Sequence, residues 1–294
     1  MNVHQLYQEV MWVGGKERTF YYQLPSIMPE AAPLVFCFHG AGSHAQHHMK
    51  LTQFHEVSEQ QQFITVFPEA WQSDPDDRMS KQWNEGRRKN SAFQHQINDV
   101  EFVLEMIEWF KRTYPIDNQR IYAEGFSNGS AFSLKLGIEC QDTFAGVGGV
   151  AGPLVIELAE NINWQKPMPL VFIMGTGDQF VPYDGRYSDA YMIDQLISAE
   201  ETGALFASSW NPRLLKQQED LLDPSQSGKH LVTKTSYVQT DGDEKVILYT
   251  LHGSGHTWPG GPESQSTLLT GKVMERFNAT QAIWDHLKNF SRTE

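Results

Sequence analysis

Ser127 lies in a sequence pattern that makes a serine hydroxyl a nucleophile. The pattern is Gly125-Phe126-Ser127-Asn128-Gly129, and it follows the short apolar segment Ile121-Tyr122-Ala123. A strand that turns sharply into a helix lifts such a serine out of the sheet, and side chains at the two glycines would collide with the neighbouring strand and helix. The free N–H groups of the following helix point at the same spot. The pattern therefore predicts a serine that attacks a carbonyl carbon.

A serine nucleophile needs a general base, which a carboxylate in turn orients. Asp178 follows the apolar run 170–174, and His256 follows the strand pattern 245–251 within a glycine-rich loop. In sheets of this class the three residues come in the order serine, acid, histidine. Because each follows a strand, we expect them to meet at the carboxyl edge of one sheet. Ser127, Asp178 and His256 are therefore the predicted catalytic triad.

Hydrolysis at a carbonyl also needs N–H donors for the oxyanion that develops. The residue after the nucleophile supplies one donor in this class of site, which here is Asn128. The second is expected in the small-residue segment His39-Gly40-Ala41-Gly42, which follows the early apolar run 34–38. We assign it to the Ala41 N–H, because the small residues let the backbone approach a substrate.

Two nearby residues compete for the acid and base roles. Asp178 can also be a turn former, since Gly-Asp pairs are common in turns, and Asp184 follows it closely. His252 falls inside the predicted strand, whereas His256 has glycine neighbours that leave its ring free to reach the serine.

Other side chains have both a functional and a structural interpretation. His44 and His48 share a predicted helix face, but no carboxylate or cysteine with zinc-type spacing accompanies them, so no metal site is predicted. Trp83 and Trp258 either line a substrate pocket or fill the core. Together with His39 and Gly40 they are the predicted pocket residues.

The elements that position these residues alternate between strand and helix patterns. Apolar runs typical of strands covered on both faces occur at 34–38, 63–67 and 170–174, and amphipathic helix patterns occur at 96–113 and 273–290. Hairpin patterns occur at 7–24 and 231–251, and a polar helical stretch runs to about residue 61. The alternation predicts an α/β fold with one mostly parallel, doubly wound sheet and helices on both faces.

We expect a single domain over residues 1–294, with pocket-shaping insertions near 69–94 and 187–230. The first insertion is irregular and rich in turn formers and charge. The second carries one or two helices over 187–211 and then a polar stretch, 212–230, that is expected to be a surface loop or cap.

The composition excludes several partners. The net charge is −13, whereas nucleic acids and anionic membranes require basic patches. No apolar run approaches the roughly 18 residues of a membrane-spanning helix, and the N-terminus has no signal-peptide pattern, so a cytoplasmic location is expected. The two cysteines, Cys37 and Cys140, are expected to be buried free thiols.

These motifs together resemble the polyhydroxybutyrate depolymerase/feruloyl esterase family of α/β-hydrolases. The matching segments are spread over most of the chain: His39–Gly42, Gly125–Gly129, Gly177–Gly185 and Gly253–Gly261. The resemblance implies an α/β-hydrolase fold and esterase activity with Ser127, Asp178 and His256 as the triad and without a cofactor. Ser130 departs from the family pattern, which often has a second glycine there.

We therefore expect a serine esterase that works through an acyl-enzyme on short-chain, hydroxyalkanoate or hydroxycinnamoyl esters, either small molecules or oligomers. A peptidase or acyltransferase is one alternative, because the same triad cleaves amides and transfers acyl groups. A catalytically silent, ligand-binding homologue is the other.

Overall fold

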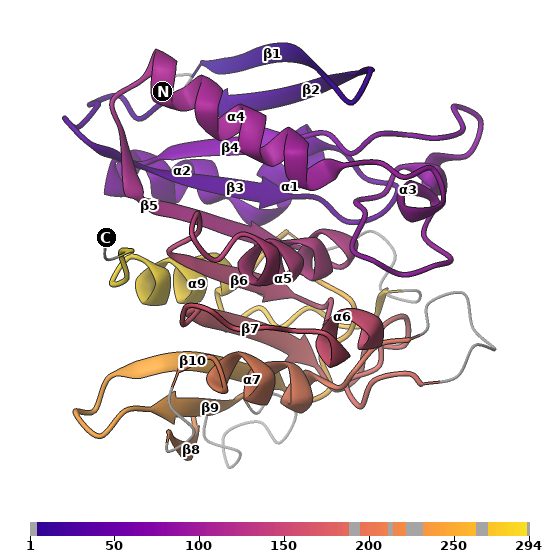
Figure 1. The fold of residues 1–294 in the computed structure, drawn as a ribbon. Helices are drawn as coiled ribbons and strands as arrows, with labels where there is room; N and C mark the ends of the chain where they lie inside the picture. The colour runs from indigo at the N-terminus through magenta and orange to yellow at the C-terminus, as the bar shows by residue number, and fades with distance from the viewer. Residues whose placement is uncertain (1–4, 188–194, 211–213, 222–231, 263–269, 293–294) are drawn as a thin grey trace.

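A large, mostly parallel sheet organises the molecule (Figure 1). The structure is a computed structural model that describes residues 5–187, 195–210, 214–221, 232–262 and 270–292. Within these residues the sheet has ten strands in the order β1-β2-β4-β3-β5-β6-β7-β10-β9-β8. The strands are β1 (Leu6–Val13), β2 (Lys16–Gln23), β3 (Ala32–Phe38), β4 (Ile64–Pro68), β5 (Ile116–Gly125), β6 (Gly146–Val150), β7 (Leu170–Gly175), β8 (Leu215–Asp220), β9 (Val232–Val238) and β10 (Glu244–Leu251).

Neighbouring strands from β4 through β3, β5, β6 and β7 to β10 pair in parallel, and both outer parts of the sheet are antiparallel. The predicted hairpins correspond to β1–β2 and β9–β10. The predicted α/β-hydrolase-like architecture is therefore confirmed.

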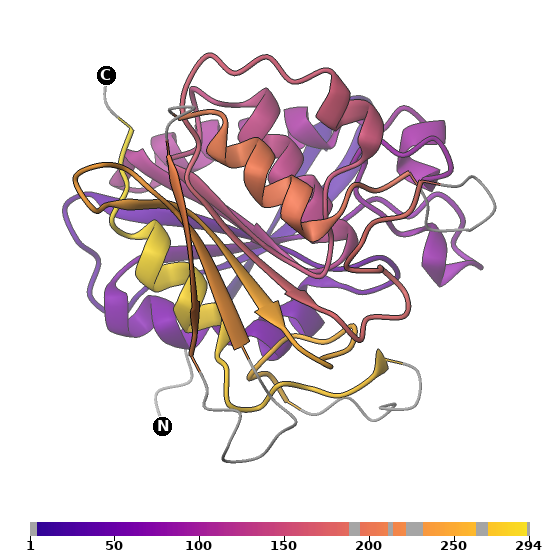
Figure 2. The same ribbon diagram turned by 90° about the horizontal axis from the view of Figure 1, so that it is seen from below.

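Helices cover both faces of the sheet, as Figure 2 shows from below. The buried side chains of α4 (Asp99–Thr113), α5 (Asn128–Glu139) and α7 (Ala199–Ala207) belong to one hydrophobic core, against which α6 (Ile156–Glu160) also packs. Those of α1 (Ala45–Thr52), α2 (Phe54–Gln61) and α9 (Ala279–Leu287) belong to the core on the other face. Two short elements, η1 (Arg78–Ser80) and α3 (Ser91–Gln94), interrupt the long segment after β4.

The β3 strand shows why a continuous apolar run fits this place. All seven of its residues are buried. Leu34, Phe36 and Phe38 point into the core with α4 and α5, whereas Val35 and Cys37 point into the core with α1 and α9. Because successive side chains of a strand point to opposite faces, a strand with helices on both sides must be apolar at every position.

Several predicted elements differ in extent from the observed ones. The helical stretch up to residue 61 is two helices, α1 and α2, because Gln53 between them has a left-handed backbone with φ of 56°. Helix α4 starts only at Asp99, since the Asn98 side chain caps it by accepting from the Glu101 N–H. The closing helix begins at Ala279, where Asn278 is the cap.

The prediction of a loop or cap over 212–230 is wrong for residues 215–220. They form the edge strand β8, which pairs antiparallel with β9. Its six side chains are all exposed, so it lacks the apolar alternation by which a half-buried strand is recognised. Residues 188–194, 211–213 and 222–231 of the second expected insertion lie outside the described residues. Of its helices, the described part contains α7.

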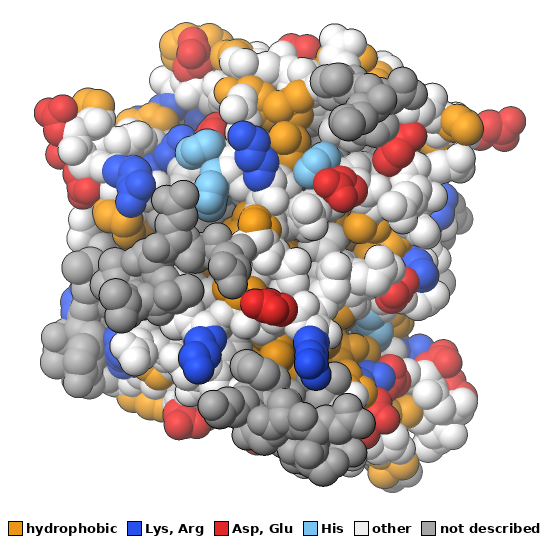
Figure 3. Space-filling view, turned by 180° about the vertical axis from the view of Figure 1, so that it is seen from behind, with side chains coloured by type: hydrophobic (Ala, Val, Ile, Leu, Met, Phe, Trp, Pro, Cys, Tyr) orange, Lys and Arg blue, Asp and Glu red, His pale blue; other side chains and the backbone are white. Residues whose placement is uncertain are grey.

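Cys37 and Cys140 are buried free thiols, as predicted. None of the helices in the described residues is long and apolar enough to cross a membrane. On the surface seen from behind, acidic and basic side chains are interspersed (Figure 3). The excess of carboxylates therefore does not form one continuous acidic patch on that face.

His286 in α9 should make the fold sensitive to mild acid. Its side chain is buried, and burial lowers the pKa of the imidazole from 6.5 to about 4. Between these values the unfolded chain binds a proton that the folded chain does not, so stability falls as the pH falls through this window. The free energy of unfolding should decrease by about 1.4 kcal/mol per pH unit from this group.

The His286→Gln variant tests this prediction by urea unfolding at several pH values between 6.5 and 4. Glutamine can still donate to the Lys245 carbonyl, which His286 Nε2 contacts at 3.3 Å, but it does not titrate. We expect a shallower pH dependence for the variant. Identical slopes for the two proteins would show that His286 does not control the acid response.

Candidate active site

Ser127 occupies a strained turn between β5 and α5. Its backbone has φ of 56° and ψ of −120°, a conformation that side-chain-bearing residues seldom adopt. A Cβ on Gly125 would lie 2.2 Å from the Gly129 carbonyl oxygen, and one on Gly129 would lie 2.1 Å from the Phe38 carbonyl oxygen. Only glycine fits both places. The Ser127 N–H donates to the Val150 carbonyl at 2.8 Å, which fixes the turn to the end of β6.

A chain of two hydrogen bonds joins Ser127, His256 and Asp178. Ser127 Oγ lies 2.9 Å from His256 Nε2, and His256 Nδ1 lies 2.7 Å from Asp178 Oδ2. A carboxylate only accepts hydrogen bonds, so Nδ1 carries the proton and donates to Asp178. This leaves the Nε2 lone pair to accept from the Ser127 hydroxyl. The structure therefore brings the three residues of the predicted triad together with a tautomer suited to proton abstraction.

Asp178, at the far end of this series of hydrogen bonds from Ser127, is fixed by its surroundings. Its carboxylate is buried, and its second oxygen, Oδ1, accepts the N–H groups of Phe180 and Val181, each at 2.9 Å. The imidazole of His256 lies near the rings of Phe126 and Phe180, with centroids 4.9 and 5.6 Å away. These contacts limit rotation of both the carboxylate and the imidazole.

The loops that carry Asp178 and His256 are tied to each other. The Gly177 N–H donates to the Ser254 carbonyl at 2.9 Å, and the Gly253 N–H donates to Thr176 Oγ1 at 2.9 Å. A Cβ on Gly175 would lie 2.2 Å from the Ser254 carbonyl oxygen. The parallel pairing of β7 and β10 brings the loop after β10 next to the end of β7. Glycine at the end of β7 leaves room for this close approach.

The two predicted oxyanion donors lie at the same cavity as Ser127. Ala41, Ser127 and Asn128 all line it. Among the described residues, neither the Ala41 N–H nor the Asn128 N–H donates a hydrogen bond to a protein acceptor. Asn128 is the first residue of α5, where N–H groups have no partner within the helix. Two unpaired donors beside the Ser127 hydroxyl are able to bind an oxyanion, if one develops there.

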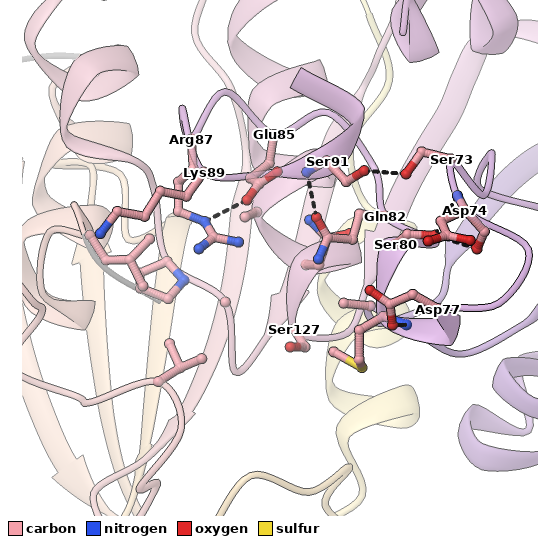
Figure 4. Close-up of a pocket in the computed structure, with 18 residues that line it drawn as sticks. Ser73, Asp74, Asp77, Ser80, Gln82, Glu85, Arg87, Lys89, Ser91 and Ser127 are labelled. Atoms are coloured by element: carbon pink, nitrogen blue, oxygen red, sulfur yellow. Dashed lines mark hydrogen bonds and ion pairs between the residues drawn. The ribbon is translucent and has the colours of Figure 1, made fainter. Parts of the chain in front are cut away.

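The cavity beside Ser127 has a volume of about 340 Å³ and a charged upper wall. Most of its lining residues come from segment 69–94. Figure 4 shows Arg87 and Lys89 on one side and Asp74 and Asp77 on the other. Glu85 is buried in this wall, and Arg87 Nε donates to it at 2.6 Å. Burial raises the pKa of the Glu85 carboxyl above its usual value.

Two predicted pocket residues turn out to be structural, which corrects the prediction. His39 and Trp83 are fully buried and do not line the cavity. Trp83 belongs to the core on the α4–α5 face, and the His39 ring lies beside it with centroids 5.3 Å apart. Gly40 lies beside Ser127, and a Cβ added to Gly40 would be 3.4 Å from Ser127 Cβ. Trp258 is almost fully buried but borders a second cavity of about 520 Å³ that His256 also lines.

The competing residues lie elsewhere. His252 is exposed and contacts Thr233 Oγ1 at 3.1 Å, and Asp184 is exposed at the surface. His48 is buried with its Nε2 3.0 Å from Glu124 Oε1, while His44 caps α1. Within the described residues, no group of three or more histidine, cysteine or acidic side chains could hold a metal ion.

Sequence reasoning did not identify Gln82, Glu85 and Arg87 as cavity residues. They lie in an irregular segment without periodicity, so no pattern distinguished the side chains that face the cavity from those that face solvent.

A sequence model of the Abhydrolase_2 family, described as phospholipase/carboxylesterase, matches residues 25–211 of the chain. The chain is 25% identical over 268 residues to the putative esterase NocK of Nocardia uniformis subsp. tsuyamanensis, covering 88% of this chain and 75% of that protein. It is 26% identical over 231 residues to feruloyl esterase B of Piromyces equi, covering 77% of this chain but 40% of that longer protein.

Among solved structures, the acetyl xylan esterase from Aspergillus awamori has a similar fold. The TM-score is 0.58 at 14% sequence identity, over 86% of this chain and 94% of that one. At this identity the similarity concerns the fold.

Proposed function

The chain belongs to the phospholipase/carboxylesterase family and is an ester hydrolase, and we propose that it cleaves esters through an acyl-enzyme on Ser127. The observation that carries this proposal is the continuous hydrogen-bonded chain from Ser127 Oγ through His256 to Asp178, with bonds of 2.9 and 2.7 Å. The Ser127 end of this series of hydrogen bonds lies at a cavity, which Ala41 and Asn128, the residues with the two unpaired N–H groups, also line.

The first half of the proposed reaction forms the acyl-enzyme. His256 Nε2 takes the Ser127 proton while Oγ bonds to the ester carbonyl carbon, and the carbonyl oxygen becomes an oxyanion facing the Ala41 and Asn128 N–H groups. The bond between the carbon and the alcohol oxygen then breaks. His256 gives its proton to the leaving alcohol, and Asp178 stabilises the imidazolium while it exists.

The second half returns the enzyme to its starting state. Water attacks the acyl carbonyl carbon as His256 Nε2 takes a proton from it. The carbon–Oγ bond breaks, the acid leaves, and Ser127 Oγ recovers the proton from His256. These steps involve only residues of the protein, the ester and water.

We further propose that the acyl group is short or carries polar substituents, as in hydroxyalkanoate and hydroxycinnamoyl esters. Relatives named as a feruloyl esterase and an acetylxylan esterase support this substrate range. The cavity beside Ser127 is of the size that small-molecule sites have, and carboxylate, amide and guanidinium groups at its wall can bind hydroxyls.

A panel of esters tests the substrate proposal. It contains p-nitrophenyl acetate and butyrate, methyl ferulate, acetylated xylan oligosaccharides and 3-hydroxybutyrate oligomers. Each is compared with a matched amide and assayed with added alcohols. We expect hydrolysis of at least one ester group, with the amides much slower.

Faster amide cleavage would instead support a peptidase, and preferential formation of new esters an acyltransferase. The absence of turnover on every ester would favour the silent homologue.

A further inference from the structure

The two proposed oxyanion donors come from segments that are far apart in the chain. Ala41 follows β3, and Asn128 begins α5. We propose that Trp83 is a positioning residue that holds both donors in place, by its indole N–H on one side and its main chain on the other. The inference rests on the proposed serine mechanism, because it concerns the groups that stabilise the oxyanion.

On one side, Trp83 fixes the loop that carries Ala41. Its indole Nε1–H donates to the His39 carbonyl at 2.9 Å. Two residues earlier, the Lys81 carbonyl accepts the Gly42 N–H at 2.9 Å. Segment 81–83 therefore holds the loop both before and after the Ala41 amide.

The ring of His39 completes this support. The Ala70 N–H donates to Nε2 at 3.1 Å, so the proton of the neutral ring is on Nδ1, which donates to the Gly40 carbonyl at 2.8 Å. Glu69 Oε2 lies 3.5 Å from Nε2, but burial lowers the pKa of His39 and favours the neutral ring. The Gly40 carbonyl and the Ala41 N–H belong to one trans peptide and point in opposite directions. Holding the carbonyl therefore aims the N–H.

On the other side, the main chain of Trp83 makes two hydrogen bonds with the side chain of Asn128. The Trp83 N–H donates to Asn128 Oδ1 at 2.7 Å, and Asn128 Nδ2 donates to the Trp83 carbonyl at 3.0 Å. Asn128 is buried, so these bonds form away from bulk water. A paired amide of this kind fixes the orientation of the residue whose own N–H is the second proposed donor.

The indole itself has little freedom to move. It is fully buried, stacks on Phe132 at a centroid distance of 5.3 Å, and meets Phe38 edge-on at 5.1 Å. A buried tryptophan usually finds some acceptor for its N–H. Here the acceptor is the carbonyl that leads into the oxyanion loop, and the same residue also holds the other donor.

The Trp83→Phe variant tests the inference, because phenylalanine keeps an aromatic ring between Phe38 and Phe132 but cannot donate to His39. Trp210→Phe is the matched control. Trp210 is half-buried, and its Nε1–H also donates to a main-chain carbonyl, that of Met168 at 3.2 Å, outside the proposed site. Both variants are assayed on the best ester of the panel and melted in parallel.

We expect Trp83→Phe to lower kcat about tenfold, which is less than the roughly 10²–10³-fold loss on deletion of a direct donor. KM should stay within about twofold, since the donors act chiefly on the transition state. An alkylboronic acid forms an adduct with Ser127 that places an oxygen at the two donors. Its inhibition constant should rise by about the same factor as kcat falls. Trp210→Phe should change none of these values.

A second variant, Asn128→Ala, removes the two hydrogen bonds between the Asn128 side chain and Trp83 but keeps the main-chain N–H at position 128. It should show the same pattern of reduced kcat and weaker boronate binding, and it keeps the inference testable if Trp83→Phe fails to fold. An active wild type with folded variants that match Trp210→Phe would overturn the positioning role alone. An inactive wild type would overturn the proposed function, and the positioning role with it.

Discussion

Replacing Ser127 with alanine should reduce kcat/KM on p-nitrophenyl butyrate by at least about 10⁴-fold, because loss of the nucleophile removes the acyl-enzyme route entirely. The Ser127 hydroxyl oxygen is the atom that His256 Nε2 contacts at 2.9 Å. Alanine fits the strained turn as well as serine does, so the fold should be retained. The measurement is the initial rate over a range of enzyme concentrations, with circular dichroism as a check on folding.

Ser133→Ala is the matched control for this variant. Ser133 is a buried serine on α5, the helix that follows Ser127, and its hydroxyl donates to the Gly129 carbonyl at 3.0 Å. Loss of that bond should cost about 1 kcal/mol of stability and leave the rate near that of the wild type. If Ser127→Ala retained wild-type activity, another residue would have to be the nucleophile.

Replacing Asp178 with asparagine should lower kcat by about 10⁴-fold with little change in the fold. The asparagine side chain is the same size, but its NH₂ group cannot accept the proton on His256 Nδ1. The asparagine NH₂ instead donates to Nδ1, so the imidazole takes the tautomer with its proton on Nε2 and can no longer accept the serine proton. The Phe180 and Val181 N–H groups, which bond Asp178 Oδ1, keep an acceptor in the asparagine oxygen.

Asp184→Asn is the comparison that separates this effect from a general loss of negative charge. Asp184 is exposed six residues later in the same loop region. It should leave kcat unchanged. Equal losses in the two variants, or a loss in Asp184→Asn alone, would show that Asp178 does not orient the base.

The turn at Ser127 and the meeting of Ser127, His256 and Asp178 could be predicted from sequence, because both depend on local, residue-specific constraints. Glycine is required at 125 and 129, because a Cβ at either position would lie only 2.1–2.2 Å from a backbone oxygen. Asp178 and His256 follow strands that pair in parallel, so their loops share one edge of the sheet. The apolar runs of β3 and β7 likewise reflect burial on both faces.

The parts that sequence did not reveal depend on long-range contacts or lack a periodic signal. Strand β8 is exposed at all six positions, so its place in the sheet follows from pairing with β9. The orientation of Trp83 follows from contacts with Phe38, Phe132 and Asn128, all of which lie 45 residues or more away along the chain. From its residue type alone, this tryptophan could equally be interpreted as a pocket residue or as a core residue.

The most direct test of the account is the site of covalent modification by a fluorophosphonate. Intact-mass spectrometry should show a single adduct on the wild-type protein, peptide mapping should place it on Ser127, and the Ser127→Ala variant should remain unmodified. A folded wild-type protein that is active on esters but carries no adduct, or carries it on a residue other than Ser127, would contradict the proposed mechanism.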